Sequence, residues 1–556
     1  MKAVRPPSLR DSTKAIRYMD GGKDVADLVG DTREVSEKAN FGRRDQGRPM
    51  SDAMGNNLNG NKLIESLLDA SSYVHSVDGP VVLHETHISW VLLAGNYAYK
   101  IKKPIVTEFL DYGSLAKRHH ACCEELRLGS RYAFGLYLDV VPITFADGHI
   151  RMDGDSQPIE FAVRMRRFEQ DALLSHQLSK NLVSVENIIQ LATAIAGFHG
   201  IAAKLEQPRE DFVQKILDQA NQNVELLVSE PLLGQDPIIQ RLENWTAVYF
   251  ESHRQHFMDR ANIGCIRECH GDLHCGNIVF WKGHWVPFDG IEFNSEYSWI
   301  DVISDIAFLV MDLQELGHPE LSAAFLNAYL EEAGDYSSLS VLRWYLVYRA
   351  LVRAKVAVMR ARQQNQVERL DAEQLAPAMA YIRLADQMTN IGPRKLWITH
   401  GVSGSGKTTG SQQIVEREGA IRIRSDIERK RLFKTSRASL TGDDAPGGGM
   451  YSPTASAATY QRLFAVAKGI LRSDFPVIVD ATFLKHADRQ RFQSLAKSEG
   501  AEFRILDFQV DVETLKQRIT QRRLTSNDAS DATLEILAIQ LRTQEPLTTE
   551  EQKMAI

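Results

Sequence analysis

The stretch Gly401-Val-Ser-Gly-Ser-Gly-Lys-Thr408 decides the fold of the last third of this 556-residue chain. A short apolar run, residues 396–399, precedes it and predicts a strand, while residues 409–417 suit a helix. Glycines at these positions let backbone N–H groups turn inward around phosphate oxygens, and the helix N-terminus adds a favourable dipole. The spacing therefore predicts a nucleotide-binding P-loop between a strand and a helix.

The P-loop motif predicts how the lysine and threonine of the loop bind the nucleotide and its metal ion. Lys407 is expected to reach the β- and γ-phosphates, and Thr408 is expected to bind Mg²⁺. The expected nucleotide-binding residues of this site are Gly401, Ser403, Gly404, Ser405, Gly406, Lys407, Thr408 and Thr409.

Two carboxylates follow the next predicted strands of this region. Residues 420–424 end at Ser425-Asp426, and residues 476–479 end at Asp480. In an open α/β sheet, ligands lie beyond the carboxyl ends of the strands. We expect Asp426 to orient or deprotonate an acceptor hydroxyl and Asp480 to hold Mg²⁺ through water. A helix N-cap is the alternative role of each.

Residues 395–544 resemble the small P-loop kinases that include gluconate kinase, zeta toxins and phage polynucleotide kinase. The shared pieces are the P-loop, the Ser425-Asp-x-x-Arg429 step and the Val477-Ile-Val-Asp480 strand. The resemblance implies an α/β P-loop NTPase domain with a parallel sheet.

In that group an arginine-bearing lid closes over the nucleotide, and Arg518-Ile-x-x-Arg522 is similar to it. The resemblance implies that Arg522 stabilises charge on the transferring phosphoryl group. Arg518 and Arg523 are weaker candidates, and a basic helix face is the alternative.

A second informative segment is Cys269-His-Gly-Asp-Leu-His-Cys-Gly-Asn277. Asp272 is a carboxylate that can accept or orient an acceptor proton. Asn277, around a tight loop, can give a neutral oxygen to Mg²⁺. Two short strands follow, and the hairpin can return Asp289 beside Asn277 as a charged metal ligand. The segment predicts a kinase catalytic loop.

The pattern His-Gly-Asp-x-His-x-x-Asn, followed by Asp, resembles the aminoglycoside phosphotransferase and choline kinase-like family over residues 62–386. Within it, the chain looks most like the uncharacterised branch fused to a P-loop kinase. The resemblance implies a two-lobed, α+β, protein-kinase-like domain. Its N-lobe would span about 62–166 and its C-lobe about 167–390.

The resemblance also implies an N-lobe lysine for the α- and β-phosphates, paired with a glutamate. Lys100, on the strand Tyr97-Ala-Tyr-Lys100, matches best, and Lys102 on the same strand face is the runner-up. Glu125 is favoured over Glu124 as the partner, with an exposed helix face as the alternative. No Gly-rich loop of the protein-kinase type precedes Lys100, so the phosphate-loop contacts stay unassigned.

The chain is thus expected to be multidomain. Residues 1–61 lack apolar periodicity and predict a disordered tail, in which Met50 and Met54 are alternative starts. The kinase-like domain would span 62–390 and the P-loop domain 394–546, because Thr389-Asn-Ile-Gly-Pro393 breaks the helical pattern between them. Residues 342–362 predict a packing helix with a solvated basic face.

The composition limits which kinds of binding partner we expect. A net charge of -7 gives no reason to expect bulk nucleic-acid or membrane binding, although the C-terminal domain could still act on nucleic acid. The absence of a signal or spanning segment predicts a cytoplasmic protein. Five cysteines do not make a disulfide scaffold. A structural zinc site is a minor alternative, and its candidate ligands are Cys265, Cys269, His270, His274 and Cys275.

The sequence therefore predicts two phosphotransferase modules that use ATP and Mg²⁺ and act on a hydroxyl of a small-molecule acceptor. Three alternatives stay open. The P-loop domain could be a regulatory ATPase, it could phosphorylate nucleic-acid ends or a nucleotide sugar, or the middle domain could be a pseudokinase scaffold.

Overall fold

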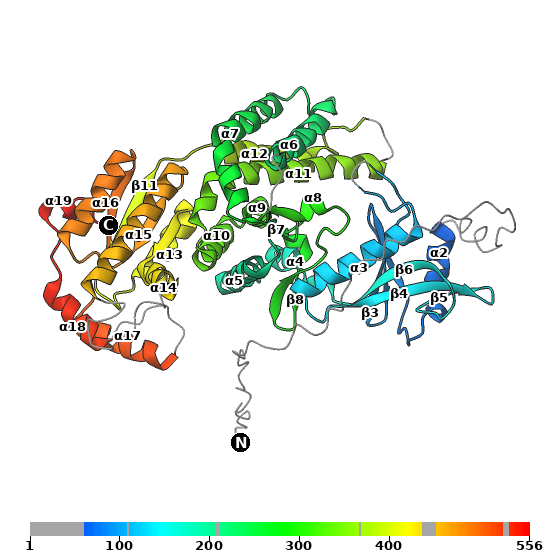
Figure 1. The fold of residues 1–556 in the computed structure, drawn as a ribbon, viewed down its shortest axis with the longest axis horizontal. Coiled ribbons are helices and arrows are strands. Elements are labelled where there is room, and N and C mark those ends of the chain that lie inside the picture. Colours follow the sequence, from blue (N-terminus) through cyan, green and yellow to red (C-terminus); the bar gives the residue numbers. More distant parts are fainter. Residues whose placement is uncertain (1–59, 108–109, 207–210, 366–368, 436–451, 526–532) are drawn as a thin grey trace, which may run out of the picture. The chain divides into compact units, whose positions relative to one another are not determined.

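The computed structural model describes residues 60–107, 110–206, 211–365, 369–435, 452–525 and 533–556 (Figure 1). These residues belong to one compact unit, Leu58–Ile556. The predicted disordered tail lies outside the described residues except at its last two positions, where helix α2 (Gly60–Leu67) begins.

The first domain begins with a six-stranded antiparallel sheet in the order β1-β2-β3-β6-β4-β5. Its strands are β1 (Val82–Glu85), β2 (Ser89–Ala94), β3 (Tyr97–Lys102), β4 (Tyr137–Ala146), β5 (His149–Met152) and β6 (Pro158–Arg166). The two-residue turn at Gly95-Asn96 joins β2 to β3, and Gly95 takes the positive φ of 58° that such a turn requires. Lys100 therefore lies in the middle of the sheet, opposite Val91 and Val163.

Helix α3 (Leu115–Tyr132) covers one face of this sheet and packs on β4 and β6. Ser114 caps its first turn by accepting the backbone N–H of Lys117 at 3.3 Å. Gly129 lets the helix approach β4, because a Cβ atom there would lie 2.4 Å from the ring of Tyr137. The close approach brings Glu125 over the middle of β3.

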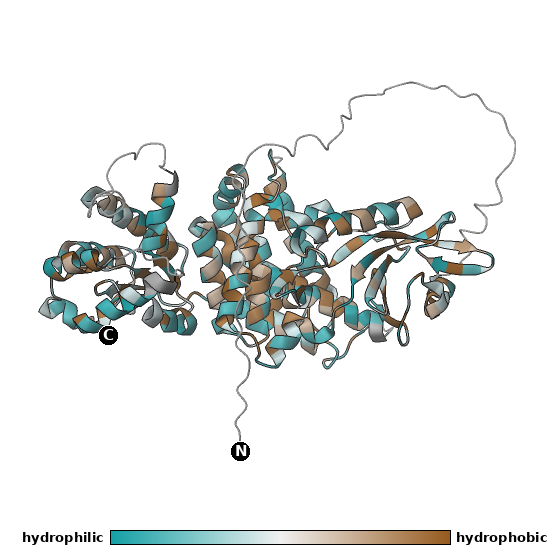
Figure 2. Ribbon diagram, turned by 90° about the horizontal axis from the view of Figure 1, so that it is seen from below, coloured by the Kyte–Doolittle hydropathy of each residue, from teal (hydrophilic) through white to brown (hydrophobic). Residues whose placement is uncertain are grey.

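The second lobe is mostly helical, and its apolar residues gather between the helices (Figure 2). Its helices are α4 (Leu174–Ser179), α5 (Val185–Ile201), α6 (Phe212–Ser229), α7 (Pro237–Asn262), α8 (Ser295–Ser298), α9 (Val302–Glu315), α10 (Pro319–Ala333), α11 (Leu339–Asn365) and α12 (Ala376–Thr389). Helix α9 is the centre of this lobe, since every residue from Val302 to Leu313 is buried.

Two short antiparallel pairs frame the Cys269–Asn277 segment. Strand β7 (Ile266–Glu268) precedes it and pairs with β10 (Trp299–Asp301). Strands β8 (Ile278–Trp281) and β9 (His284–Pro287) follow it as the predicted hairpin. The hairpin returns the chain so that the N–H of Phe288 donates to the Asn277 carbonyl at 2.9 Å.

The last domain has a four-stranded parallel sheet in the order β12-β13-β11-β14. Its strands are β11 (Lys395–His400), β12 (Ile421–Arg424), β13 (Val477–Asp480) and β14 (Glu502–Asp507). Its helices are α13 (Lys407–Glu418), α14 (Ser425–Thr435), α15 (Pro453–Arg472), α16 (His486–Ser498), α17 (Val512–Thr525), α18 (Leu534–Thr543) and α19 (Thr549–Gln552). The predicted fold class is confirmed: a two-lobed α+β domain is followed by a parallel α/β domain.

Both outer strands of the parallel sheet have further hydrogen-bond partners. Beside β12, the Asn327 side chain of α10 donates to the Ala420 carbonyl at 3.0 Å and accepts the N–H of Arg422 at 2.7 Å. Beside β14, the last residues of the chain pair with Ile505, whose N–H donates to the Met554 carbonyl at 3.0 Å. Helix α10 thereby joins the helical lobe to the parallel sheet.

A buried ion pair anchors the C-terminal segment. Arg489 of α16, whose side chain is fully buried, donates to both carboxylate oxygens of Glu551 at 2.8 and 3.0 Å. It also donates to the carbonyls of Phe483, Glu545 and Pro546. Among the described helices, none is long and apolar enough to cross a membrane.

Glu551→Gln should destabilise the protein in a pH-dependent way. Burial raises the pKa of Glu551, but the Arg489 hydrogen bonds outweigh it and lower the pKa from 4.5 to about 2. A lowered carboxyl pKa adds stability above pH 4.5, and this is lost as the pH falls toward about 2. We expect a loss of about 3 kcal/mol at neutral pH, measured by chemical denaturation. The gap to wild type should narrow as the pH falls, and a pH-independent gap would contradict this account.

Candidate functional sites

The catalytic-loop segment is held by two buried carboxylates of α9. Asp305 accepts the backbone N–H of His270 at 3.1 Å and of Gly271 at 2.9 Å. Asp312, two turns further along the helix, accepts the N–H of Cys275 at 2.8 Å. His199 of α5 lies 3.2 Å from Asp305 through Nε2. The loop conformation is therefore fixed by backbone hydrogen bonds to the core of the lobe.

The structure brings Asp272 and Asn277 together within this loop. The Asn277 side-chain nitrogen donates to the Asp272 carboxylate at 2.9 Å and to its carbonyl at 3.1 Å. His274 Nδ1 accepts the N–H of Gly276 at 3.1 Å, so a neutral ring carries its proton on Nε2, 3.5 Å from Asp272. Burial raises the pKa of Asp272, but His274 outweighs it and holds that pKa below its usual range. Asp272 is therefore a carboxylate at neutral pH.

Lys100 of β3 pairs with its expected partner Glu125 and also with Asp289, which was expected beside Asn277. Its Nζ donates to Glu125 Oε1 of α3 at 2.9 Å and also to Asp289 Oδ1. Burial lowers the pKa of Lys100, but Asp289 and Glu125 outweigh it and raise that pKa above its usual range. Asp289 adopts a left-handed backbone with φ of 61°, and its N–H donates to the Tyr137 hydroxyl at 2.9 Å. Three elements far apart in the sequence thus converge on one charged cluster.

Lys102, the alternative lysine, has a different environment. It is fully buried and donates to the other oxygen of Glu125 at 2.5 Å and to Glu292. The Tyr112 hydroxyl donates to the same Glu292 oxygen at 2.6 Å. Lys100, in contrast, lines a cavity. The geometry thus favours Lys100 as the phosphate-facing lysine, while Lys102 links Glu125 to the segment that follows Asp289.

Glu292 and Tyr112 are site residues that the motif comparison missed. The only sequence signal for Glu292 was its position three residues after Asp289, and Tyr112 lies in a segment between β3 and α3 that carries no motif. Glu124, the alternative to Glu125, pairs instead with Arg127 on the surface of α3 at 2.7 Å.

A cavity of about 590 Å³ connects these groups. Lys100, Glu125, Asp272 and Asp289 all line it, together with apolar residues of β2 and β3. The first candidate site therefore has a buried lysine–glutamate pair and two further carboxylates, Asp272 and Asp289, around one cavity.

The structure does not assemble the minor zinc alternative. Among the described residues, ligand atoms that lie within 4.8 Å of one another belong to His199, Cys269 and Asp305. Only Cys269 is shared with the predicted set. Asp305 already accepts two backbone N–H groups, and His270 Nε2 donates to the Phe288 carbonyl at 2.9 Å. These groups are bound within the fold rather than arranged around an ion.

The second candidate site is the loop between β11 and α13. Gly401, Gly404 and Gly406 have φ values of 144°, 85° and 91°, which side chains with a Cβ rarely adopt. A Cβ at Gly401 would lie 2.7 Å from the Phe508 carbonyl. Ser405 Oγ is buried and has no hydrogen-bond partner among the described residues. A phosphate oxygen would fit this orphaned hydroxyl.

The remaining loop side chains have defined partners. The Ser403 N–H donates to Gln540 Oε1 at 2.8 Å, and Lys407 Nζ donates to the Val402 carbonyl at 2.8 Å. Thr408 Oγ1 donates to Asp480 Oδ2 at 2.7 Å, which brings the two expected Mg²⁺ residues together. Thr409 is exposed on α13.

The other predicted residues of this site lie on α14 and α17. Asp426 is in the first turn of α14 and lies 3.8 Å from Arg429. Arg518 of α17 donates to the Gly404 carbonyl at 3.2 Å, so this weaker lid candidate contacts the loop. Arg522 and Arg523 are on the same helix, but their side chains lie outside the described residues.

Comparisons with known proteins place the chain in a family. It is 31% identical over 482 residues to an uncharacterized protein of Mycobacterium tuberculosis, and the match covers 84% of this chain and 92% of the relative. The chain belongs to the family of this mycobacterial protein. An uncharacterized protein of Mycobacterium bovis is also 31% identical to this chain over 482 residues. A family model described as an AAA domain matches residues 396–547, which confirms the predicted P-loop domain.

Solved structures are similar to each part of this family member. A choline/ethanolamine kinase family protein from Mesorhizobium loti is 13% identical and covers 60% of this chain and 99% of its own, with a TM-score of 0.34. A gluconokinase from Sinorhizobium meliloti is 23% identical and covers 30% of this chain and 81% of its own, with a TM-score of 0.20.

Gly129→Ala should disturb the first site from a distance. The added Cβ would push the Tyr137 ring, and the Tyr137 hydroxyl holds the Asp289 N–H. We expect overpacking to lower the free energy of unfolding by about 1–3 kcal/mol. Chemical denaturation measures this loss. Gly197→Ala in α5 is the matched control, because a Cβ there meets nothing within 4 Å. Equal stability of the two variants would show that Tyr137 does not limit the approach of α3.

Proposed function

We propose that the middle domain, residues 62–390, transfers the γ-phosphoryl group of ATP to a hydroxyl of a small molecule. The observation that carries this proposal is that Lys100, Asp289 and Asp272 all line one cavity. Lys100 donates to Asp289, and Asp272 accepts from the side chain of Asn277. A phosphate-binding cation and an acceptor-orienting carboxylate that line one cavity are parts that phosphoryl transfer requires.

In the proposed reaction, the acceptor oxygen bonds to the γ-phosphorus while the bond from that phosphorus to the bridging oxygen breaks. The hydroxyl proton passes to the Asp272 carboxylate, and ADP leaves with the electron pair. Asn277 holds the orientation of Asp272, and the lowered pKa keeps Asp272 charged to orient the hydroxyl. Lys100, held by Glu125, is placed to bind phosphate oxygens. Catalysis would then come mainly from positioning and electrostatics.

Asn277 and Asp289 fit a magnesium ion by their chemistry. Asn277 uses its side-chain nitrogen to bond Asp272, which leaves its amide oxygen for a cation. Carboxylate and amide oxygens are the protein ligands that Mg²⁺ accepts. Bound there, the ion would neutralise charge on the phosphates.

We propose that the P-loop domain, residues 394–546, is a second ATP-dependent phosphotransferase. The orphaned Ser405 hydroxyl and the Thr408–Asp480 pair support ATP and Mg²⁺ as its ligands. Asp426 and Arg522 are the proposed acceptor-orienting and charge-stabilising residues. A small-molecule acceptor is proposed for this domain as well.

Separate loss of each site should remove a separate set of products. We expect Asp272→Ala in the full chain to lower transfer by the middle domain by about 10²–10⁴-fold, and Lys407→Ala to abolish transfer by the P-loop domain. The measurement is an untargeted screen of a metabolite mixture with γ-labelled ATP. Asp259→Ala and Lys497→Ala are matched controls, because both residues are exposed and lie on helices α7 and α16, which carry none of the proposed site residues.

The alternative functions of the two domains predict different outcomes of this screen. If Lys407→Ala alone removed every labelled product, an active middle domain would be untenable. If Lys407→Ala removed ATP hydrolysis but no labelled product, the P-loop domain would be a regulatory ATPase. Failure of the Lys407→Ala chain to bind ATP with Mg²⁺ would favour a pseudokinase. Labelling of an oligonucleotide 5′ end that depends on Lys407 would make the P-loop domain a nucleic-acid kinase.

A further inference from the structure

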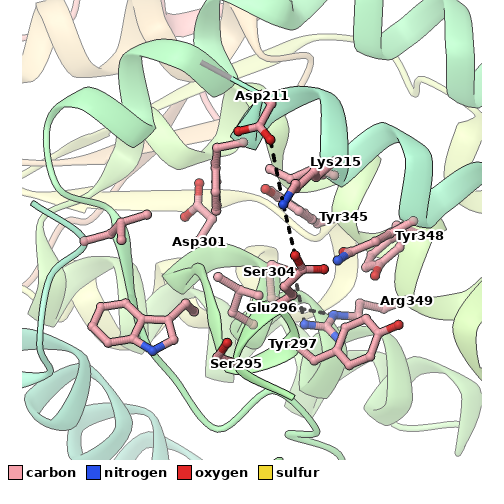
Figure 3. A pocket seen from close by; sticks show the side chains of 16 residues that line it. Asp211, Lys215, Ser295, Glu296, Tyr297, Asp301, Ser304, Tyr345, Tyr348 and Arg349 are labelled. Atoms are coloured by element: carbon pink, nitrogen blue, oxygen red, sulfur yellow. Dashed lines mark hydrogen bonds and ion pairs between the residues drawn. The ribbon is translucent and has the colours of Figure 1, made fainter. Parts of the chain in front are cut away.

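A second cavity, of about 430 Å³, is lined by residues of the helical lobe (Figure 3). The two cavities share four lining residues, Gln219, Tyr297, Tyr348 and Arg349. Arg349 lies on α11, which the sequence predicts to have a solvated basic face. That prediction is wrong at this position, because Arg349 is only 6% exposed.

The hydrogen bonds of Arg349 all go to neutral groups. Its guanidinium donates to the Gly271 carbonyl at 3.0 Å and to the carbonyl and hydroxyl of Ser304 at 3.1 Å each. It also lies over the rings of Phe308, 4.8 Å away, and Tyr348, 5.5 Å away. Within the described part of the chain, it forms no ion pair with a carboxylate. A guanidinium has five N–H groups, so two remain beyond these three bonds.

The carboxylates around this second cavity are already paired with other cations. Lys215 lies 3.7 Å from Asp211 and 3.0 Å from Glu296, and Figure 3 shows its amine between them. Asp301 accepts from Arg260 at 2.6 Å. Asp305 feels the positive charge of Arg349, but its oxygens hold the catalytic-loop N–H groups and His199. Among the described residues, the buried Arg349 guanidinium thus has no carboxylate within ion-pair distance, although Asp305 lies near enough to interact with its charge.

Arg349 is also tied to the catalytic loop. The carbonyl it holds belongs to Gly271, the residue before Asp272. A molecule bound to the remaining N–H groups of Arg349 would lie in the second cavity, where the two cavities meet. A hydroxyl elsewhere on that molecule could then reach toward Asp272.

We propose that the second cavity binds the acceptor through an oxyanion on Arg349, so that the acceptor of the middle domain is a small alcohol bearing a carboxylate or phosphate. This inference rests on the proposed phosphotransferase function. A planar guanidinium suits such a group, because two parallel N–H donors match two oxyanion oxygens. Tyr297 and Tyr348 supply aromatic faces for the carbon skeleton. The transfer step is the one given above, with the proton passing to Asp272 and ADP leaving.

The test uses the full chain carrying Lys407→Ala, so that the P-loop domain is silent. Transfer is measured to matched pairs that differ in charge: glycerol against glycerate, and glucose against gluconate. Glycerol phosphate is the phosphate-bearing arm, and ethanolamine is the cationic arm. We expect kcat/KM for the anionic members to exceed that of their partners by at least about tenfold, because hydrogen bonds to a charged group are stronger than those between neutral groups. A preference for ethanolamine or for the uncharged partners would overturn the proposal.

Variants separate Arg349 from the rest of the cavity. Arg349→Gln should raise KM for the anionic acceptors by about tenfold or more and leave KM for ATP unchanged. Arg349→Lys keeps the charge but loses the fork, so its KM should lie between the two. Arg241→Gln is the matched control, because Arg241 is exposed, pairs with Asp386 and lines neither cavity. A larger effect of Arg241→Gln than of Arg349→Gln, or a KM for ATP that rises in parallel, would contradict the assignment.

Calorimetry keeps the two proposals distinguishable. Binding of glycerate, gluconate, glycerol phosphate and inorganic phosphate is measured in the presence of ADP and Mg²⁺, with and without Arg349→Lys and Arg349→Gln. Binding that depends on Arg349 without any transfer would leave the oxyanion site standing and sink the transferase function. If ADP binds and none of these anions does, the oxyanion site is rejected.

Discussion

The hydrogen bonds from residues 270–275 to two carboxylates of α9 are the constraint on which the first site depends. Asp305 and Asp312 are buried carboxylates, and they accept three backbone N–H groups of residues 270–275. A buried carboxylate is costly unless its oxygens are bonded, so the helix and the loop stabilise each other. The bonds hold backbone groups, and Gly271 is a position of the loop where a side chain would not fit, because its φ is 83° and a Cβ would lie 2.5 Å from the Tyr297 carbonyl. This arrangement leaves Asp272 and Asn277 free to be selected for chemistry.

The same helix lobe connects the two candidate sites. Tyr329 of α10 lies 2.9 Å from His199, which in turn lies 3.2 Å from Asp305. Two residues before Tyr329, Asn327 bonds the backbone beside β12, and Glu331 pairs with Arg424 at the end of that strand at 2.9 Å. Asp426 follows two residues later. Helix α10 therefore contacts His199, which lies beside the Asp305 that holds the first loop, and it also contacts β12. Strand β12 leads to Asp426 of the second candidate site.

Local patterns in the sequence predicted much of the fold. Strand β3 contains the predicted strand Tyr97-Ala-Tyr-Lys100, and Glu125 lies on a helix as expected, because alternation and helical spacing are signals carried within one element. The P-loop and the Asp272–Asn277 pair were also predictable, since their geometry is set within a few residues. Glu292, Tyr112 and Asp305 were not, because their roles arise from contacts between distant segments. Arg349 shows most clearly what local patterns leave out. Helical spacing places Arg349 on a helix, but its burial depends on the loop that packs against that helix.

The hydrogen bonds beside the outer strands of the parallel sheet have a consequence for how the chain can be divided. An open strand edge is a template for pairing with another molecule, and folded proteins protect it. Here one edge is covered by the Asn327 amide from the preceding domain and the other by residues 554–556. Cutting the chain at the linker near residue 391 would uncover the β12 edge. A P-loop domain cut from its neighbour would therefore present an open strand edge that the intact chain protects.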